Sequence, residues 1–139
     1  MRRAVICAAM VIGCGGSPSS ENTQLSVAGS YPTAVMLVPG GSCGAVPVQG
    51  NTTVVAHSPG ASTLTLTHAG NTYAGTVTPG GAFTISPTAV SGGAATVSMT
   101  GQFNATGFTA NVHVVQQSPT CQYDVTWTGT KTGAPNTIP

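Results

Sequence analysis

The segments Phe108-Thr-Ala-Asn-Val-His-Val-Val-Gln116 and Cys121-Gln-Tyr-Asp-Val-Thr-Trp-Thr-Gly129 decide the fold. Apolar and polar side chains alternate along both segments, with the two-residue period of β-strands that bury one face. A loop over residues 117–120 pairs residue 116 with residue 121, and large apolar side chains then face small or apolar ones. The expected inward pairs are Val114–Tyr123, Val112–Val125, Ala110–Trp127 and Phe108–Gly129. We therefore predict an antiparallel hairpin over residues 108–129.

Three further turns extend this hairpin upstream, at residues 105–106, at Gly70-Asn71 and at residues 79–81. Gly-Asn is a favourable two-residue hairpin turn, and Pro-Gly-Gly interrupts any strand. The inward pairs expected from these turns are Phe103–Phe108, Met99–Val112, Leu66–Gly75, Leu64–Val77, Phe83–Val77 and Ile85–Gly75. The apolar sets keep the same parity from one hairpin to the next, as one continuous buried face requires.

The strand candidates are residues 32–38, 52–57, 62–68, 72–78, 82–86, 95–103, 108–116 and 121–130. About eight short antiparallel strands with one apolar face must close into a small barrel or fold into a sandwich. We predict an all-β antiparallel meander that closes into a small barrel, because sequence neighbours pair so readily. A β-sandwich is the alternative, and residues 86–94 are where its crossover would lie.

Charged residues make up only 4% of the chain, against about a quarter in ordinary globular proteins. The sequence therefore has no basic patch, and we expect no nucleic-acid partner. General acid–base catalysis needs titratable groups in pairs, and few are available.

The first residues have the pattern of a secretory signal peptide. Arg2 and Arg3 precede a short apolar run that ends at Gly13, which is too short to span a bilayer. The string Val11-Ile12-Gly13-Cys14 resembles the lipobox of bacterial lipoproteins. The resemblance implies cleavage before Cys14, attachment of acyl chains such as palmitate to that residue, and a lipid anchor in the bacterial cell envelope. By the same resemblance, Gly15 favours the outer membrane.

This interpretation divides the chain into a lipoprotein signal peptide (1–13), a flexible tether (14–28) and a β-domain (29–139). It also assigns the cysteines. Cys7 leaves with the signal peptide and Cys14 takes the lipid, so Cys43 and Cys121 remain in an oxidising compartment, and we predict a disulfide between them. The rival interpretation is a cysteine metal site, but this spacing matches no zinc motif.

Two groups of side chains are candidates for chemistry. His113 and Asp124 are expected to lie opposite each other on the outer face, as an exposed ion pair or, alternatively, as a catalytic dyad with Ser118 from the adjoining loop. No nucleophile-elbow pattern surrounds Ser118, so we expect no enzyme. Parity places His68 inward and His113 outward, so we expect no metal site formed by these residues with His57.

The second group consists of inward aromatic residues, which are expected in the core or at the floor of a ligand cavity. Its members are Tyr73, Tyr123, Trp127 and His68. The predicted function is a non-catalytic, membrane-anchored lipoprotein domain with a binding or structural role in the envelope, without a cofactor. The alternatives are a small-molecule carrier, similar in architecture only to lipocalins and avidins, and a periplasmic enzyme inhibitor that would use the loop at residues 40–44.

Overall fold

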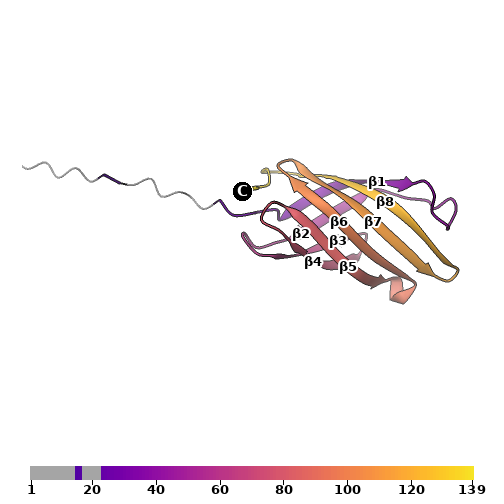
Figure 1. Ribbon diagram of the computed structural model, residues 1–139. Helices are drawn as coiled ribbons and strands as arrows, with labels where there is room; N and C mark the ends of the chain where they lie inside the picture. The colour runs from indigo at the N-terminus through magenta and orange to yellow at the C-terminus, as the bar shows by residue number, and fades with distance from the viewer. Residues whose placement is uncertain (1–14, 17–22) are drawn as a thin grey trace, which may run out of the picture.

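The computed structural model describes residues 15–16 and 23–139, and its strands form one closed antiparallel barrel (Figure 1). The predicted signal peptide (1–13), Cys14 and Glu21 lie outside the described residues. The strands are β1 (Gly29–Val38), β2 (Asn51–Ala56), β3 (Thr63–His68), β4 (Asn71–Val77), β5 (Ala82–Val90), β6 (Ala95–Asn104), β7 (Gly107–Gln117) and β8 (Thr120–Thr130), with a 3-10 turn, η1 (Ser91–Gly93). Each strand pairs with its sequence neighbour, and β1 closes the ring against β8. The predicted meander barrel is confirmed, and the sandwich alternative is wrong.

The hairpin that decides the fold has the predicted register. Val114 lies opposite Tyr123, Ala110 opposite Trp127, and Phe108 opposite Gly129. The preceding hairpin sets Phe103 against Phe108 and Met99 against Val112, also as predicted. These long ladders form the most regular wall of the barrel, which Figure 1 shows as β6, β7 and β8 side by side.

The turn predicted at Gly70-Asn71 is wrong by one residue. The turn residues are Ala69 and Gly70, both with positive φ (47° and 79°), and His68 pairs with Asn71. Positive φ at both central positions defines the type I′ turn of two-residue hairpins, in which glycine suits the second position. Leu66 therefore faces Tyr73 rather than residue 75. The shift moves the register by two residues, which preserves the parity of the buried face.

No crossover occurs at residues 86–94. Instead β5 continues to Val90 through a register shift between Ile85 and Thr88, and η1 leads directly into β6. Pro87 lies within this irregularity and has no N–H to donate to a neighbouring strand. The β4–β5 ladder is accordingly limited to Thr76–Thr84 and Val77–Phe83.

Packed rings fill one end of the barrel. Phe83 and Phe103 lie 4.9 Å apart between ring centroids, and Tyr31 and Phe108 lie 5.4 Å apart. The N-terminal segment closes this end, because Leu25 and Val27 are 3% and 0% exposed. The segment that leads into β1 and the C-terminal segment meet here, where Ser26 bridges to Thr137 (Figure 1).

The boundary predicted at residue 29 is therefore too late, because Leu25 and Val27 belong to the core rather than to a flexible tether. Hydrogen bonding by the Tyr31 hydroxyl explains why this segment is held against the barrel. The Tyr31 hydroxyl lies 2.6 Å from the Val27 carbonyl oxygen and 2.7 Å from Asn136 Oδ1, which ties the entering chain to the leaving one. Burial raises the pKa of Tyr31 to about 12, so this hydroxyl keeps its proton.

Within residues 15–16 and 23–139, no helix is long and apolar enough to cross a membrane.

Candidate functional site

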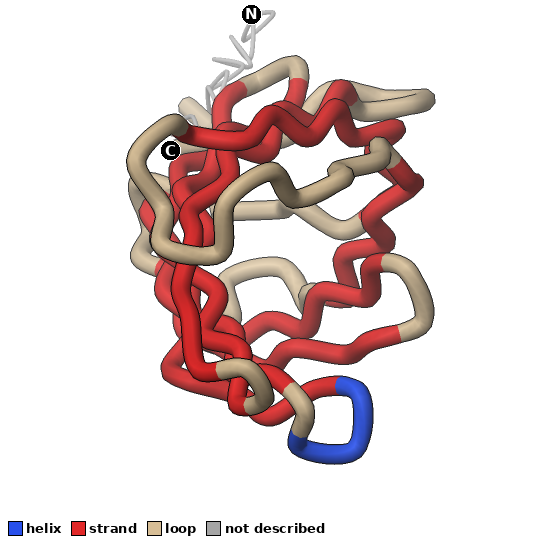
Figure 2. Tube along the Cα trace, turned by 90° about the vertical axis from the view of Figure 1, so that its right-hand side faces the viewer, coloured by secondary structure: helices blue, strands red, loops and turns tan. Residues whose placement is uncertain are grey.

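The end of the barrel opposite the chain termini contains a cavity of about 470 Å³. Residues from β1 and from β3 to β8 line it, together with residues 47–49 of the β1–β2 loop. Figure 2 views the barrel from this end, with η1 at the rim. The structure brings together all four side chains that the sequence singled out for a ligand cavity, which are His68, Tyr73, Tyr123 and Trp127.

The size of the inward side chains explains why this end is hollow. Here β6, β7 and β8 present aliphatic side chains to the cavity, among them Ala95, Val97, Val114 and Val125, whereas rings fill the other end. Of the described residues, none that lines the cavity carries a formal charge. The site therefore offers apolar surface and neutral hydrogen-bonding groups.

Trp127 forms the aromatic wall of the cavity together with two neighbours. The His68 ring stacks on the indole at 4.1 Å between centroids and 28° between planes. The Tyr73 ring approaches the same indole edge-on, at 6.4 Å and 72°. Burial raises the pKa of Tyr73, and the proximity of Tyr123 raises it further. Both effects keep the Tyr73 phenol neutral.

His68 is only 7% exposed, and its Nδ1 lies 2.8 Å from Thr53 Oγ1. Thr53 Oγ1 in turn lies 2.8 Å from Thr33 Oγ1, which donates to the Tyr31 carbonyl oxygen at 2.7 Å. This chain of buried polar groups crosses from β3 through β2 to β1. Burial lowers the pKa of His68, because a low-dielectric surrounding disfavours the imidazolium.

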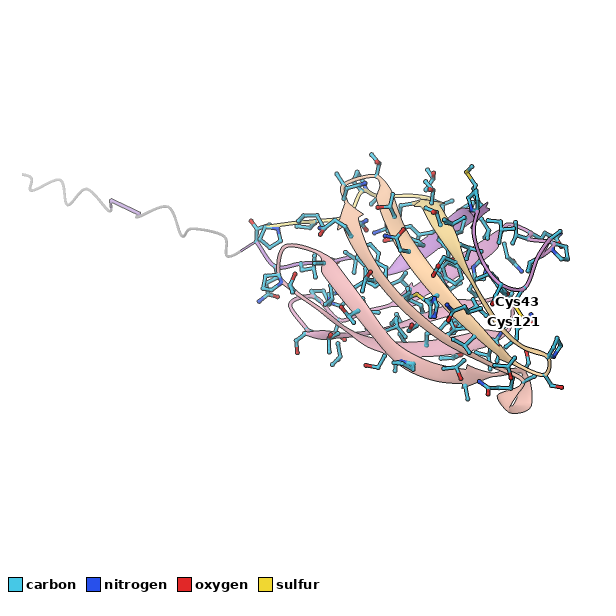
Figure 3. The ribbon with its side chains drawn as sticks, turned by 45° about the vertical axis from the view of Figure 1, so that its right-hand side comes forward. Cys43 and Cys121 are labelled. Carbon is cyan, nitrogen blue, oxygen red and sulfur yellow. A yellow bond between two sulfur atoms is a disulfide. The ribbon has the colours of Figure 1, made fainter. Side chains whose placement is uncertain are left out.

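The β1–β2 loop is held over the cavity by β8. Cys43 and Cys121 form a disulfide with their Cα atoms 5.0 Å apart, which confirms the predicted pair (Figure 3). Beside it, the Ser42 N–H donates to the Gln122 carbonyl oxygen at 2.8 Å, and the Gln122 N–H donates to Ser42 Oγ at 2.9 Å. A Cβ at Gly41 would lie 2.8 Å from the same carbonyl oxygen, so a close approach requires glycine there. Residues 41–43 of the predicted inhibitory loop thus lie against β8.

His113 and Asp124 lie outside the barrel. The two residues are opposite each other as predicted, with 2.7 Å between Nδ1 and Oδ1. Their side chains are 41% and 55% exposed, and an exposed pair of this kind contributes at most about 1 kcal/mol. Ser118 lines the cavity mouth instead, so the structure does not assemble the dyad with its nucleophile.

The structure places His68 inside the barrel and His113 outside it, as their parity predicted. His57 is bonded to the Ala61 carbonyl oxygen at 2.9 Å. In the part of the chain that the structure describes, no three His, Cys, Asp or Glu side chains come together as a metal site.

Sequence reasoning missed two parts of the site. Thr33 and Thr53 form the hydrogen-bond chain that reaches His68. The loop residues 47–49 line the cavity. Thr33 and Thr53 fall on the inward parity of their strands, next to an inward histidine, and this coincidence was a usable signal. The loop carries no periodicity, so its position depended on the disulfide. Comparisons of the chain with protein-family models, with curated proteins and with solved structures found no match.

The lowered pKa of His68 predicts a pH dependence of stability. Below about pH 6.5, the ordinary histidine pKa, the unfolded chain takes up a proton that the folded chain resists, so the free energy of unfolding should fall as the pH falls. In His68→Phe, the part of this pH dependence of the unfolding free energy that His68 contributes should disappear. Urea unfolding between about pH 7.5 and pH 5 measures it. The exterior variant His113→Gln is the control that should keep the His68 contribution, and an unchanged slope in His68→Phe would refute the assignment.

Proposed function

We propose that this protein is a non-catalytic binding barrel, which takes a small uncharged molecule into the cavity beside Trp127 and is anchored to a bacterial envelope membrane through acylated Cys14. One observation carries the binding role. The barrel is filled at one end and hollow at the other, and the hollow end has an aromatic wall without a charged lining residue in the described chain.

The dimensions and chemistry of the cavity support this role. Small-molecule sites are typically about 300–1,000 Å³, mainly apolar, with a few polar groups that orient the ligand, and this cavity of about 470 Å³ lies within that range. A charged ligand would lose its hydration without meeting a counter-charge, which is costly. An uncharged ligand with a planar apolar part suits the wall of Trp127 and Tyr73.

The anchor is supported by the lipobox-like string at residues 11–14 and by the disulfide, since disulfides persist in oxidising compartments. The described chain enters the barrel at the filled end, where Leu25 and Val27 are buried. An anchor at Cys14 therefore leaves the cavity mouth at the end of the barrel away from the attachment point. That orientation would keep the mouth open to the aqueous phase.

The binding role predicts that the uncharged dye N-phenyl-1-naphthylamine binds and becomes fluorescent in the full chain carrying Cys14→Ser, which takes no acyl chain. Trp127 is the only tryptophan of the chain, so its emission should fall as energy passes to the bound dye. Ala95→Phe, which places a ring in the cavity, should weaken binding at least about tenfold, equivalent to about 1.4 kcal/mol.

The matched control is Ala34→Phe, which adds the same ring on the exposed face of β1 and should leave dye binding unchanged. Binding that is equally strong in Ala95→Phe, or absent from the parent chain, would contradict the proposed role.

The anchor predicts that expression in a bacterium with a lipoprotein-processing pathway yields a membrane-bound protein whose first residue is acylated Cys14. Intact-mass analysis and N-terminal peptide mapping measure this. Cys14→Ser should abolish the mass increase and release the protein from the membrane fraction. An unmodified Cys14 in the wild-type protein would rule out the anchor.

A further inference from the structure

The proton positions in the chain from Tyr31 to His68 follow from its geometry. A carbonyl oxygen can only accept, so the Thr33 hydroxyl donates its single proton to the Tyr31 carbonyl oxygen. The bond between Thr33 and Thr53 must then use the proton of Thr53. Because the Thr53 hydroxyl already donates its proton to Thr33, it can only accept from His68. The hydrogen bond between Thr53 and His68 therefore requires an N–H at His68 Nδ1.

This sequence of donors fixes the tautomer of His68. In a neutral imidazole one ring nitrogen donates and the other accepts, so Nδ1–H leaves Nε2 as an acceptor with a free lone pair. Within residues 23–139, Nε2 has no hydrogen-bonding partner, and it is not among the fully buried polar atoms that lack one. Since His68 is 7% exposed and lines the cavity, its remaining accessible surface faces the cavity.

The surroundings of Nε2 restrict what can bind there. The His68 ring is stacked on Trp127 at 4.1 Å, and the Thr53 bond holds the other edge of the imidazole. The nearby phenol of Tyr73 has no bonded partner in the described part of the chain either. A ligand that enters therefore meets a fixed neutral acceptor beside an aromatic wall.

We propose, building on the proposed binding role, that the ligand is an uncharged aromatic molecule that donates an N–H or O–H hydrogen bond to Nε2 of His68. Thr53 is a positioning residue in this scheme, because it holds the proton on Nδ1 and so keeps Nε2 an acceptor. Ligands that offer only acceptors at this point leave two lone pairs facing each other, which a buried site penalises.

Two ring compounds of nearly equal size test the donor requirement. Indole carries an N–H where benzofuran carries an oxygen. In the Cys14→Ser chain at about pH 7.5, indole should displace bound N-phenyl-1-naphthylamine with an affinity about tenfold higher than benzofuran, since one buried hydrogen bond separates them. In Thr53→Val the His68 proton is free to move to Nε2, and the preference for indole should shrink toward equality.

The matched control is Thr52→Val, which makes the same change on the exposed face of β2 and should keep the preference. A measurement without any substitution in the barrel covers the case in which Thr53→Val misfolds. Long-range ¹H–¹⁵N correlation spectra of the Cys14→Ser chain should show the His68 proton on Nδ1 and an unprotonated Nε2.

The outcomes separate this inference from the binding role on which it rests. Equal displacement by indole and benzofuran while the dye binds, or a proton on Nε2, would overturn the donor requirement and leave the binding role standing. No dye binding in the parent chain would overturn the binding role, and the ligand inference with it. A preference for indole that Thr53→Val removes and Thr52→Val keeps supports both.

Discussion

The contact between large inward rings and glycines on the facing strand decides the shape of this barrel. Phe108 lies over Gly129, and Phe83 lies over Gly101, in pairs set by the β7–β8 and β5–β6 registers. A Cβ at either glycine would collide with the ring opposite, so the rings can reach the barrel axis only because these positions carry no side chain. The rings then interlock with Tyr31 and Phe103 and fill one end of the barrel, which the N-terminal segment closes.

The other end of the barrel is hollow because it lacks these large inward rings. Beyond Ala110 and Trp127 the inward residues of β6 to β8 become mainly aliphatic, and side chains of this size leave space at the axis. The disulfide and the Ser42–Gln122 bonds hold the β1–β2 loop at the mouth, while buried threonines orient the one histidine that lines the space. Packing therefore places the cavity, and hydrogen bonding gives it a chemical preference.

Alternation in the sequence was sufficient to predict the barrel, the β6–β7–β8 registers and the convergence of His68, Tyr73, Tyr123 and Trp127, whereas the Cys43–Cys121 pair followed from the assignment of the other two cysteines. It succeeded because a register error of one residue would turn every buried side chain outward. It could not distinguish registers that differ by two residues, and the Ala69-Gly70 turn was misplaced for that reason. It also missed the burial of Leu25 and Val27, because that segment is too short to show a period. The hydrogen-bond chain to His68 was missed as well, because it forms only where β1, β2 and β3 lie side by side.

The free energy of unfolding of Gly129→Ala, compared with Gly80→Ala, tests the central constraint most directly. Both variants add one methyl group. At Gly129 the new Cβ meets the Phe108 ring, whereas at Gly80 nothing lies within 4 Å of it. Gly129→Ala should lose about 1–3 kcal/mol through overpacking, and Gly80→Ala should be neutral or slightly stabilising, because alanine restricts the unfolded chain. A Gly129→Ala protein as stable as the wild type would contradict the account, because the rings would then not depend on the missing side chain.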